Sequence, residues 1–171
     1  MLVPFTLFHL IVLANAVGLS ADDLAARFPE DTLVRISYLP TLRALLALHG
    51  GQPAKSIELL EVAAPYEMGD HSGASVGFSG PLYPVYVRGL ALLAAHQGAD
   101  AEFQKILDHR GIVVADPIGA VARLQLGRAF MAAGDVKRAA VAYQDFLTLW
   151  KDADPDIPLL KAAKLEYAKL Q

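Results

Sequence analysis

The chain has 171 residues, of which 54% are hydrophobic and 19% charged, with a formal net charge of −3. This length suits one ordinary domain, and the apolar content is high enough to bury a core, which argues against a disordered chain. The slightly acidic balance offers no basic face for nucleic acid. Cysteine is absent, which excludes a disulfide framework and thiolate metal sites without fixing the compartment.

The N-terminal segment 1–18 contains no Lys, Arg, Asp or Glu and permits two interpretations. Ala14-Asn15-Ala16 resembles a small-x-small cleavage site, which favours a secretory signal or membrane anchor. However, no basic residue precedes the apolar stretch and Pro4 lies early in it, so the segment also fits the hydrophobic first helix of a hairpin. A spanning helix needs about 20 apolar residues, so the length is marginal for an anchor. We separate 1–19 from a domain over 20–171 and favour a cytoplasmic location, with both interpretations open.

The remainder predicts an all-α fold, because helix-length apolar segments alternate with short Gly, Pro or Asp punctuation. Ser20-Ala21-Asp22-Asp23 resembles a capping box at the start of the first of these helices. Residues 69–80 contain four glycines and three serines and form the predicted loop. Gly111 is expected to break a helix, and Asp116-Pro117 to start the next one. The predicted helices cover about 20–28, 31–49, 54–64, 81–95, 99–109, 117–133, 136–151 and 159–170.

Short turns at Gly50-Gly51, His96-Gln97-Gly98 and Gly134-Asp135 join these helices into antiparallel pairs. The predicted hairpins span about 31–65, 81–110 and 117–151. Each hairpin leaves an apolar face that stacking against its neighbour would bury. The final helix, about 159–170, has a polar face typical of a capping helix; the charged residues on it are Lys161, Lys164, Glu166 and Lys169.

The third hairpin resembles a tetratricopeptide repeat (TPR) in the spacing of small and aromatic residues. The residues that carry this resemblance are Leu126, Gly127, Phe130, Gly134, Ala139 and Tyr143. Arg123 departs from it, because the family often has tryptophan there. The first hairpin matches less well, with Ala44 in place of the glycine and Ser56 and Leu60 on its second helix. In the second hairpin Gly89 and Phe103 are counterparts, but Gly89 and Ala99 are ten residues apart instead of twelve. The turn therefore looks two residues short, which leaves open a distorted hairpin or a different helix phase.

Residues 24–171 also resemble the C-terminal TPR region of bacterial serine/threonine protein kinases and transcriptional regulators. The phrases that carry this impression are RFPEDTLV, YLPTLRALLAL, LYPVYVRGLALL, EFQKILDHRGIV and YQDFLTLWKDADPDIP. The kinase part itself is missing, since there is no Gly-rich nucleotide loop, no His-Arg-Asp and no Asp-Phe-Gly. The resemblance therefore implies a regulatory or partner-binding tail of a larger signalling protein, built as a TPR-like α-solenoid.

A search for catalytic chemistry finds no candidate. No two histidines have metal-ligand spacing, and three of them (His49, His96 and His109) lie at predicted helix ends, where they offset the helix dipole. The loop 69–80 lacks the Gly-Lys-Ser/Thr ending of a phosphate-binding loop, and there is no GxSxG elbow. We therefore predict a chain that is not an enzyme, with no catalytic residue, cofactor or metal.

The predicted function is a non-catalytic protein–protein interaction module or scaffold. In TPR stacks the first helix of each hairpin lines a concave face that receives a peptide. The residues placed on or beside that face are Tyr38, Tyr83, Tyr86, Arg88, Gln125 and Arg128. Tyr and Arg are frequent in binding hot spots, although these tyrosines also fit between hairpins with their hydroxyls at the surface. Alternatives are a structural spacer or self-association element, or a membrane-associated protein anchored through 1–18.

Overall fold

The computed structural model describes residues 21–69, 82–113 and 116–170. In these ranges all regular structure is helical, with nine α-helices, two shorter helical segments and no strand, which confirms the predicted all-α class. Segment 1–18, Ser20 of the predicted capping box and the loop 70–80 lie outside the described residues. The helices are α2 (Ala21–Arg27), η1 (Val34–Tyr38), α3 (Leu39–His49), α4 (Pro53–Leu59), η2 (Ala64–Tyr66), α5 (Tyr83–Ala94), α6 (Asp100–Asp108), α7 (Arg110–Val113), α8 (Ile118–Ala132), α9 (Val136–Leu149) and α10 (Pro158–Ala168).

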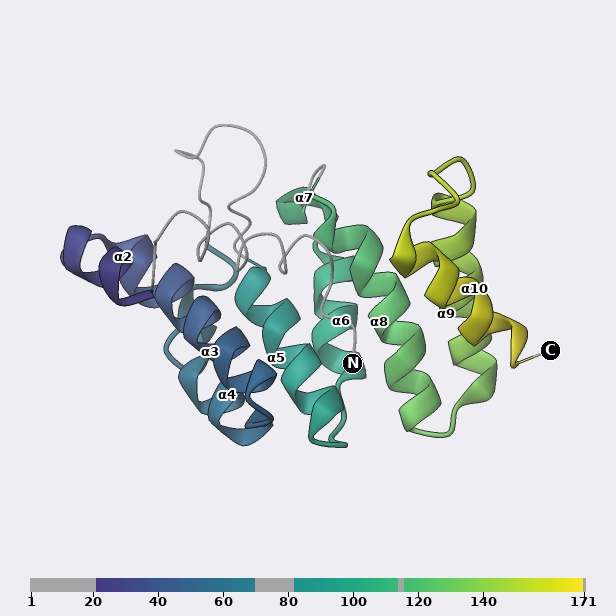
Figure 1. Cartoon of the computed structure of the whole chain (residues 1–171), viewed down its shortest axis with the longest axis horizontal. Helices are drawn as coiled ribbons and strands as arrows, with labels where there is room; N and C mark the ends of the chain where they lie inside the picture. Colours follow the sequence, from purple (N-terminus) through teal and green to yellow (C-terminus); the bar gives the residue numbers. More distant parts are fainter. Residues whose placement is uncertain (1–20, 70–81, 114–115, 171) are drawn as a thin grey trace.

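The helices follow one another along the long axis of the molecule, from α2 at one end to α10 at the other (Figure 1). Consecutive helices α3 and α4, α5 and α6, and α8 and α9 contact each other as pairs. The second helix of each pair also contacts the helix that comes next in the row: α4 contacts α5, α6 contacts α8, and α9 contacts α10. Each helix thus packs against the helix before it and the helix after it, and one cluster of buried apolar residues continues from α3 to α10.

The three helix pairs share one turn geometry. In each turn one residue adopts a positive φ: +73° at Gly51, +56° at His96 and +78° at Gly134. The next residue donates its N–H to the carbonyl five positions back, in the pairs Gln52–Ala47, Gln97–Leu92 and Asp135–Phe130, each at 2.9 Å. This is the bond that closes a helix in a Schellman motif. All three turns were predicted at these positions.

Small residues lie where the paired helices cross. A Cβ built on Gly127 would lie 3.1 Å from Cδ2 of Tyr143, and one on Gly89 only 2.7 Å from Cε1 of Phe103. In the first pair Ala44 occupies the equivalent place and is fully buried. Three further residues of the third hairpin's predicted signature, Leu126, Phe130 and Ala139, are buried in the core.

The second pair differs from the third in the entry to its return helix. His96 follows Gly89 by as many residues as Gly134 follows Gly127, so the turn is not shortened, and that prediction is wrong. Instead α6 begins four residues after His96, whereas α9 begins two residues after Gly134. Because of the extra non-helical residues, a different position of the return helix faces the glycine. Phe103 lies two positions closer to Gly89 along the sequence than Tyr143 does to Gly127.

Two predicted helix boundaries are also wrong. The helix expected over 54–64 ends at Leu59, and the chain continues through turns to the short 3₁₀ segment η2. Gly111 does not break a helix but lies inside α7. The break comes at His109, whose backbone leaves the helical region at φ −110° and ψ 51°. Its Nδ1 lies 2.7 Å from the carbonyl oxygen of Lys105, so the side chain occupies an acceptor at the helix end.

The predicted helix over 31–49 begins with a π-helical stretch, η1. Leu39 donates its N–H to the carbonyl of Val34, five residues back, in place of the usual four. Pro40 follows directly and has no N–H to donate, so the regular bond pattern is interrupted at this point. Thr41 compensates in part, since its Oγ1 donates to the carbonyl of Ser37 at 2.7 Å.

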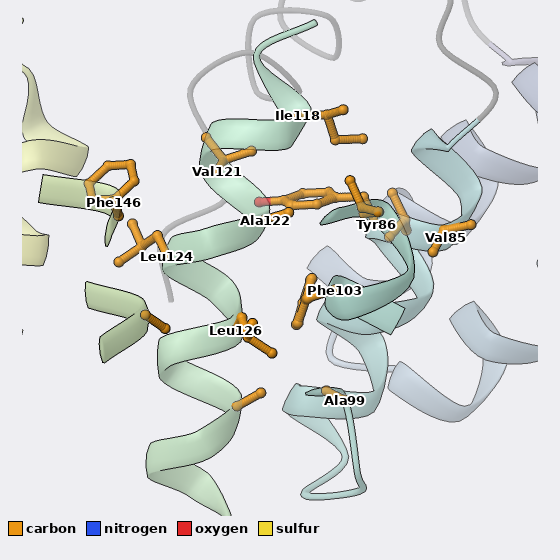
Figure 2. Packing of buried hydrophobic residues seen from close by; sticks show 14 of the residues in the cluster. Val85, Tyr86, Ala99, Phe103, Ile118, Val121, Ala122, Leu124, Leu126 and Phe146 are labelled. Carbon is orange, nitrogen blue, oxygen red and sulfur yellow. The ribbon is translucent and has the colours of Figure 1, made fainter. Parts of the chain in front are cut away.

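The centre of the core lies between the second and third pairs. Tyr86, Phe103 and Phe146 are its largest fully buried side chains. The rings of Tyr86 and Phe103 meet edge to face, with centroids 5.9 Å apart and planes at 66°. Figure 2 shows both rings on the side of α8 that carries Ala122 and Leu126. The small Ala122, which is fully buried, leaves room for the ring of Tyr86.

Candidate partner-binding face

The structure places the six predicted partner-binding residues on η1, α5 and α8. Tyr38, Tyr83, Arg88 and Arg128 are half-buried. Tyr86 and Gln125 are only 0% and 2% exposed, so the prediction that these two side chains lie at the surface is wrong. The predicted residues are Tyr38 on η1, Tyr83, Tyr86 and Arg88 on α5, and Gln125 and Arg128 on α8.

Tyr86 and Gln125 form a buried polar contact between α5 and α8. Nε2 of Gln125 donates to the phenolic oxygen of Tyr86 at 3.2 Å. In Figure 2 that oxygen points toward α8. Burial raises the pKa of Tyr86 far above its ordinary value, so the group stays neutral. The alternative that tyrosines pack between hairpins therefore holds for Tyr86, except that its hydroxyl is buried as well.

Tyr83 connects α5 to the start of α8. Its hydroxyl donates to Oδ1 of Asp116 at 3.1 Å. The same oxygen accepts the N–H of Ile118 at 2.9 Å, so Asp116 caps α8 as predicted. Burial, together with the negative charge of Asp116, raises the pKa of Tyr83 well above its ordinary value.

Arg88 belongs to a network of four charged side chains, which we call the Glu67 network: Glu67, Arg88, Glu102 and Lys105. Arg88 binds both carboxylate oxygens of Glu67 through its two terminal nitrogens, and its Nη2 also donates to Oε2 of Glu102 at 2.6 Å. Nζ of Lys105 donates to Oε2 of Glu67 at 2.7 Å. Two carboxylates thus meet two cations, so the network has no net charge.

Glu67 is the centre of this network, and its side chain is only 1% exposed. Burial acts to raise the pKa of its carboxyl, but the hydrogen bonds and charges of Arg88 and Lys105 outweigh burial and hold the pKa below its ordinary value. Sequence reasoning missed this residue. Its partners lie 21 and 38 positions away, so no local pattern could have indicated it.

Arg128 joins the third pair to the last helix. Its Nε and Nη2 donate to the two carboxylate oxygens of Glu166 on α10, at 2.8 and 2.7 Å. The hydroxyl of Tyr143 on α9 donates to the same carboxylate at 2.8 Å. Burial acts to raise the pKa of Glu166, but the hydrogen bond and charge of Arg128 hold it below the ordinary value. This contact ties α8, α9 and α10 together.

Five of the six predicted residues therefore hold helices to one another. Tyr38 is the exception, since no side-chain hydrogen bond to it occurs among the described residues. In the described ranges no three His, Cys, Asp or Glu residues gather where they could hold a metal ion. Nor does any helix of those ranges have the length and apolar character needed to cross a membrane.

Comparison with protein-family models, with curated proteins and with solved structures gives no match. The class that the structure defines is an all-helical protein in which neighbouring helices pack against each other.

Proposed function

We propose that the chain is a non-catalytic protein-interaction module, built as a TPR-like α-solenoid with α10 as its capping helix. The observation that carries this proposal is the repetition of one packing rule through three helix pairs. Each pair has a small residue at its crossing, a positive-φ residue seven positions later, and a return helix that also contacts the next helix in the row. Repeats of this kind form extended surfaces that suit protein partners.

The resemblance to TPR regions of bacterial kinases and transcriptional regulators extends the proposal to a regulatory tail of a larger signalling protein. On this view the partner contacts the first helices of the pairs. Tyr38 and Tyr83 are the aromatic side chains of the predicted face that remain partly exposed. Arg128 contributes charge on this face and Arg88 nearer its margin, but their existing ion pairs limit what they can offer a partner.

A second candidate, self-association, has one specific observation in its favour. Val141 on α9 and Leu165 on α10 are 62% and 67% exposed, so apolar side chains face solvent near the C-terminal end of the row. A second copy of the chain could cover them.

Site-specific photo-crosslinking separates these functions. Benzoylphenylalanine in place of Tyr38 or Tyr83 puts the crosslinker on the first helices while keeping an aromatic ring. The same residue in place of Val141 is the matched control on a return helix. The proposal expects one heterologous protein crosslinked at Tyr38 and Tyr83 but not at Val141. A crosslinked dimer of the chain at Val141 would favour self-association, and no crosslink at the first helices would contradict the proposal.

A further inference from the structure

A hollow of about 390 Å³ lies between the second and third helix pairs, and none of the six predicted partner-binding residues lines it. Its walls come from α6, α7, the start of α8 and the end of α9. Figure 1 shows α7 beside the first turn of α8, at the edge of the row. Pockets for small organic ligands have volumes of about 300–1,000 Å³, so this hollow has room for a small one.

One wall of the hollow is apolar. It includes Ile106, which is fully buried, and Leu149 and Trp150 at the end of α9. The indole of Trp150 is held against the ring of Phe146, with centroids 4.9 Å apart. A flat aromatic surface fixed in this way offers a large contact area to an apolar group.

Two arginines, Arg110 and Arg123, also line the hollow. Nη1 of Arg123 donates to the backbone carbonyl of Gly119 at 2.9 Å, which holds the side chain over the first turn of α8. Neither arginine has an ion pair with any described residue, and Arg35 is the one other arginine of which this is true. The arginines that do have ion pairs are Arg27, Arg43, Arg88, Arg128 and Arg138.

Asp116 also lines the hollow, but its carboxylate does not neutralise either arginine by contact. Its Oδ1 is engaged by the hydroxyl of Tyr83 and the N–H of Ile118. Its Oδ2 is buried from solvent and has no hydrogen-bond partner among the residues that the structure describes. The charged side chains that line the hollow are therefore two cations and one carboxylate.

We propose that this hollow binds a small organic acid that joins one carboxylate to one aromatic or bulky apolar group. Arg110 and Arg123 bind the carboxylate, because guanidinium groups without an ion pair offer charge-assisted hydrogen bonds to planar anions. Leu149 and Trp150 receive the apolar group. The site shares no residue with the predicted partner-binding face, so the inference does not depend on the proposed function.

Trp150 provides the measurement, because it is the chain's single tryptophan. The full-length chain is titrated with 3-phenylpropionate and octanoate, and Trp150 fluorescence is followed. The matched neutral probe is 3-phenylpropionamide. We expect a saturable change with at least one acid and at least tenfold weaker binding of the amide, since a charge-assisted contact is lost. Equal binding of the amide, or no saturable change with either acid, would overturn the proposal.

Variants then assign the contact to the two arginines. Arg110→Gln/Arg123→Gln should weaken binding of the acid at least tenfold, whereas Arg35→Gln, which removes another arginine without an ion pair, should leave it unchanged. Circular dichroism confirms that all variants keep their helices. An N-acetylated tetrapeptide ending in phenylalanine is the last probe. Saturable binding of this peptide, with neither free acid binding, would replace the small acid with a peptide terminus and so overturn the assignment.

Discussion

The ring of Phe103 lies so close to the backbone of Gly89 that a Cβ on Gly89 would come within 2.7 Å of its Cε1 atom. Phe103 is fully buried. Gly127 stands in a similar relationship to Tyr143, but there the distance is 3.1 Å. The two glycines therefore form a matched pair that differs in how tightly the helices cross.

Gly89→Ala should destabilise the chain by about 1–3 kcal/mol, because the added methyl group overpacks the crossing of α5 and α6. Gly127→Ala should cost clearly less, since the better helix propensity of alanine, about 1 kcal/mol, offsets a smaller steric conflict. Urea denaturation followed by circular dichroism gives both values. Equal losses for the two variants would show that the crossing of α5 and α6 is not the tighter one.

Glu67→Gln should lower the free energy of unfolding by about 3 kcal/mol, because it leaves Lys105 without its carboxylate partner and Arg88 with Glu102 alone. Glu58→Gln is the control, since Glu58 pairs with Lys55 at 2.8 Å on an exposed part of α4. An exposed pair contributes about 0–1 kcal/mol, so the control should change little. If both variants unfold at the same urea concentration, the Glu67 network does not stabilise the fold.

Two carboxyl groups contribute to the pH dependence of stability. The pKa values of Glu67 and Glu166 in the folded chain are below the ordinary 4.5. Between the folded pKa values and the ordinary pKa, the unfolded chain therefore binds more protons than the folded chain. The stability contributed by these two groups is complete above the ordinary pKa and is lost as the pH falls through the folded pKa values. Each unit of lowering corresponds to about 1.4 kcal/mol.

Denaturation curves between about pH 6 and 3 measure this loss. Glu67→Gln removes one of the titrating groups, so the stability of that variant should fall less steeply with acid than that of the natural chain. Parallel pH profiles for the two proteins would contradict the role of Glu67.

Tyr86→Phe should destabilise the chain by about 1–3 kcal/mol, because Nε2 of Gln125 loses its acceptor inside the core. Adding Gln125→Leu should recover much of this loss, since an apolar side chain needs no partner there. A double-mutant cycle from urea denaturation gives the coupling energy. Purely additive effects would mean that the hydrogen bond between the two residues contributes nothing.

His96→Gly should stabilise the chain by about 1 kcal/mol, because a side chain at positive φ meets its own backbone and glycine does not. His96 is exposed, so its side chain loses no packing on replacement. Gly134→Ala, at φ +78° in the corresponding turn, should have the opposite sign. Thermal unfolding of the two variants tests the pair, and a lower melting temperature for His96→Gly would contradict the prediction.

Local patterns in the sequence were enough for the helical class, the three turns and the cap at Asp116. These depend on helix propensity, on glycine and proline, and on side chains that bond their own backbone within a few residues. The spacing of Gly127, Gly134 and Tyr143 likewise indicated a close helix crossing, which the structure contains. The TPR assignment itself and the partner-binding function stay predictions.

Burial and long-range pairing were decided only by the tertiary structure. Tyr86 and Gln125 look like surface residues of a first helix, yet their side chains meet 39 positions apart inside the core. Glu67 has no distinguishing neighbours in the sequence, and Arg110, Arg123 and Trp150 line one hollow from α7, α8 and the end of α9. The reason is physical: a residue's periodicity gives its face on one helix, but which neighbour covers that face depends on how all the helices pack.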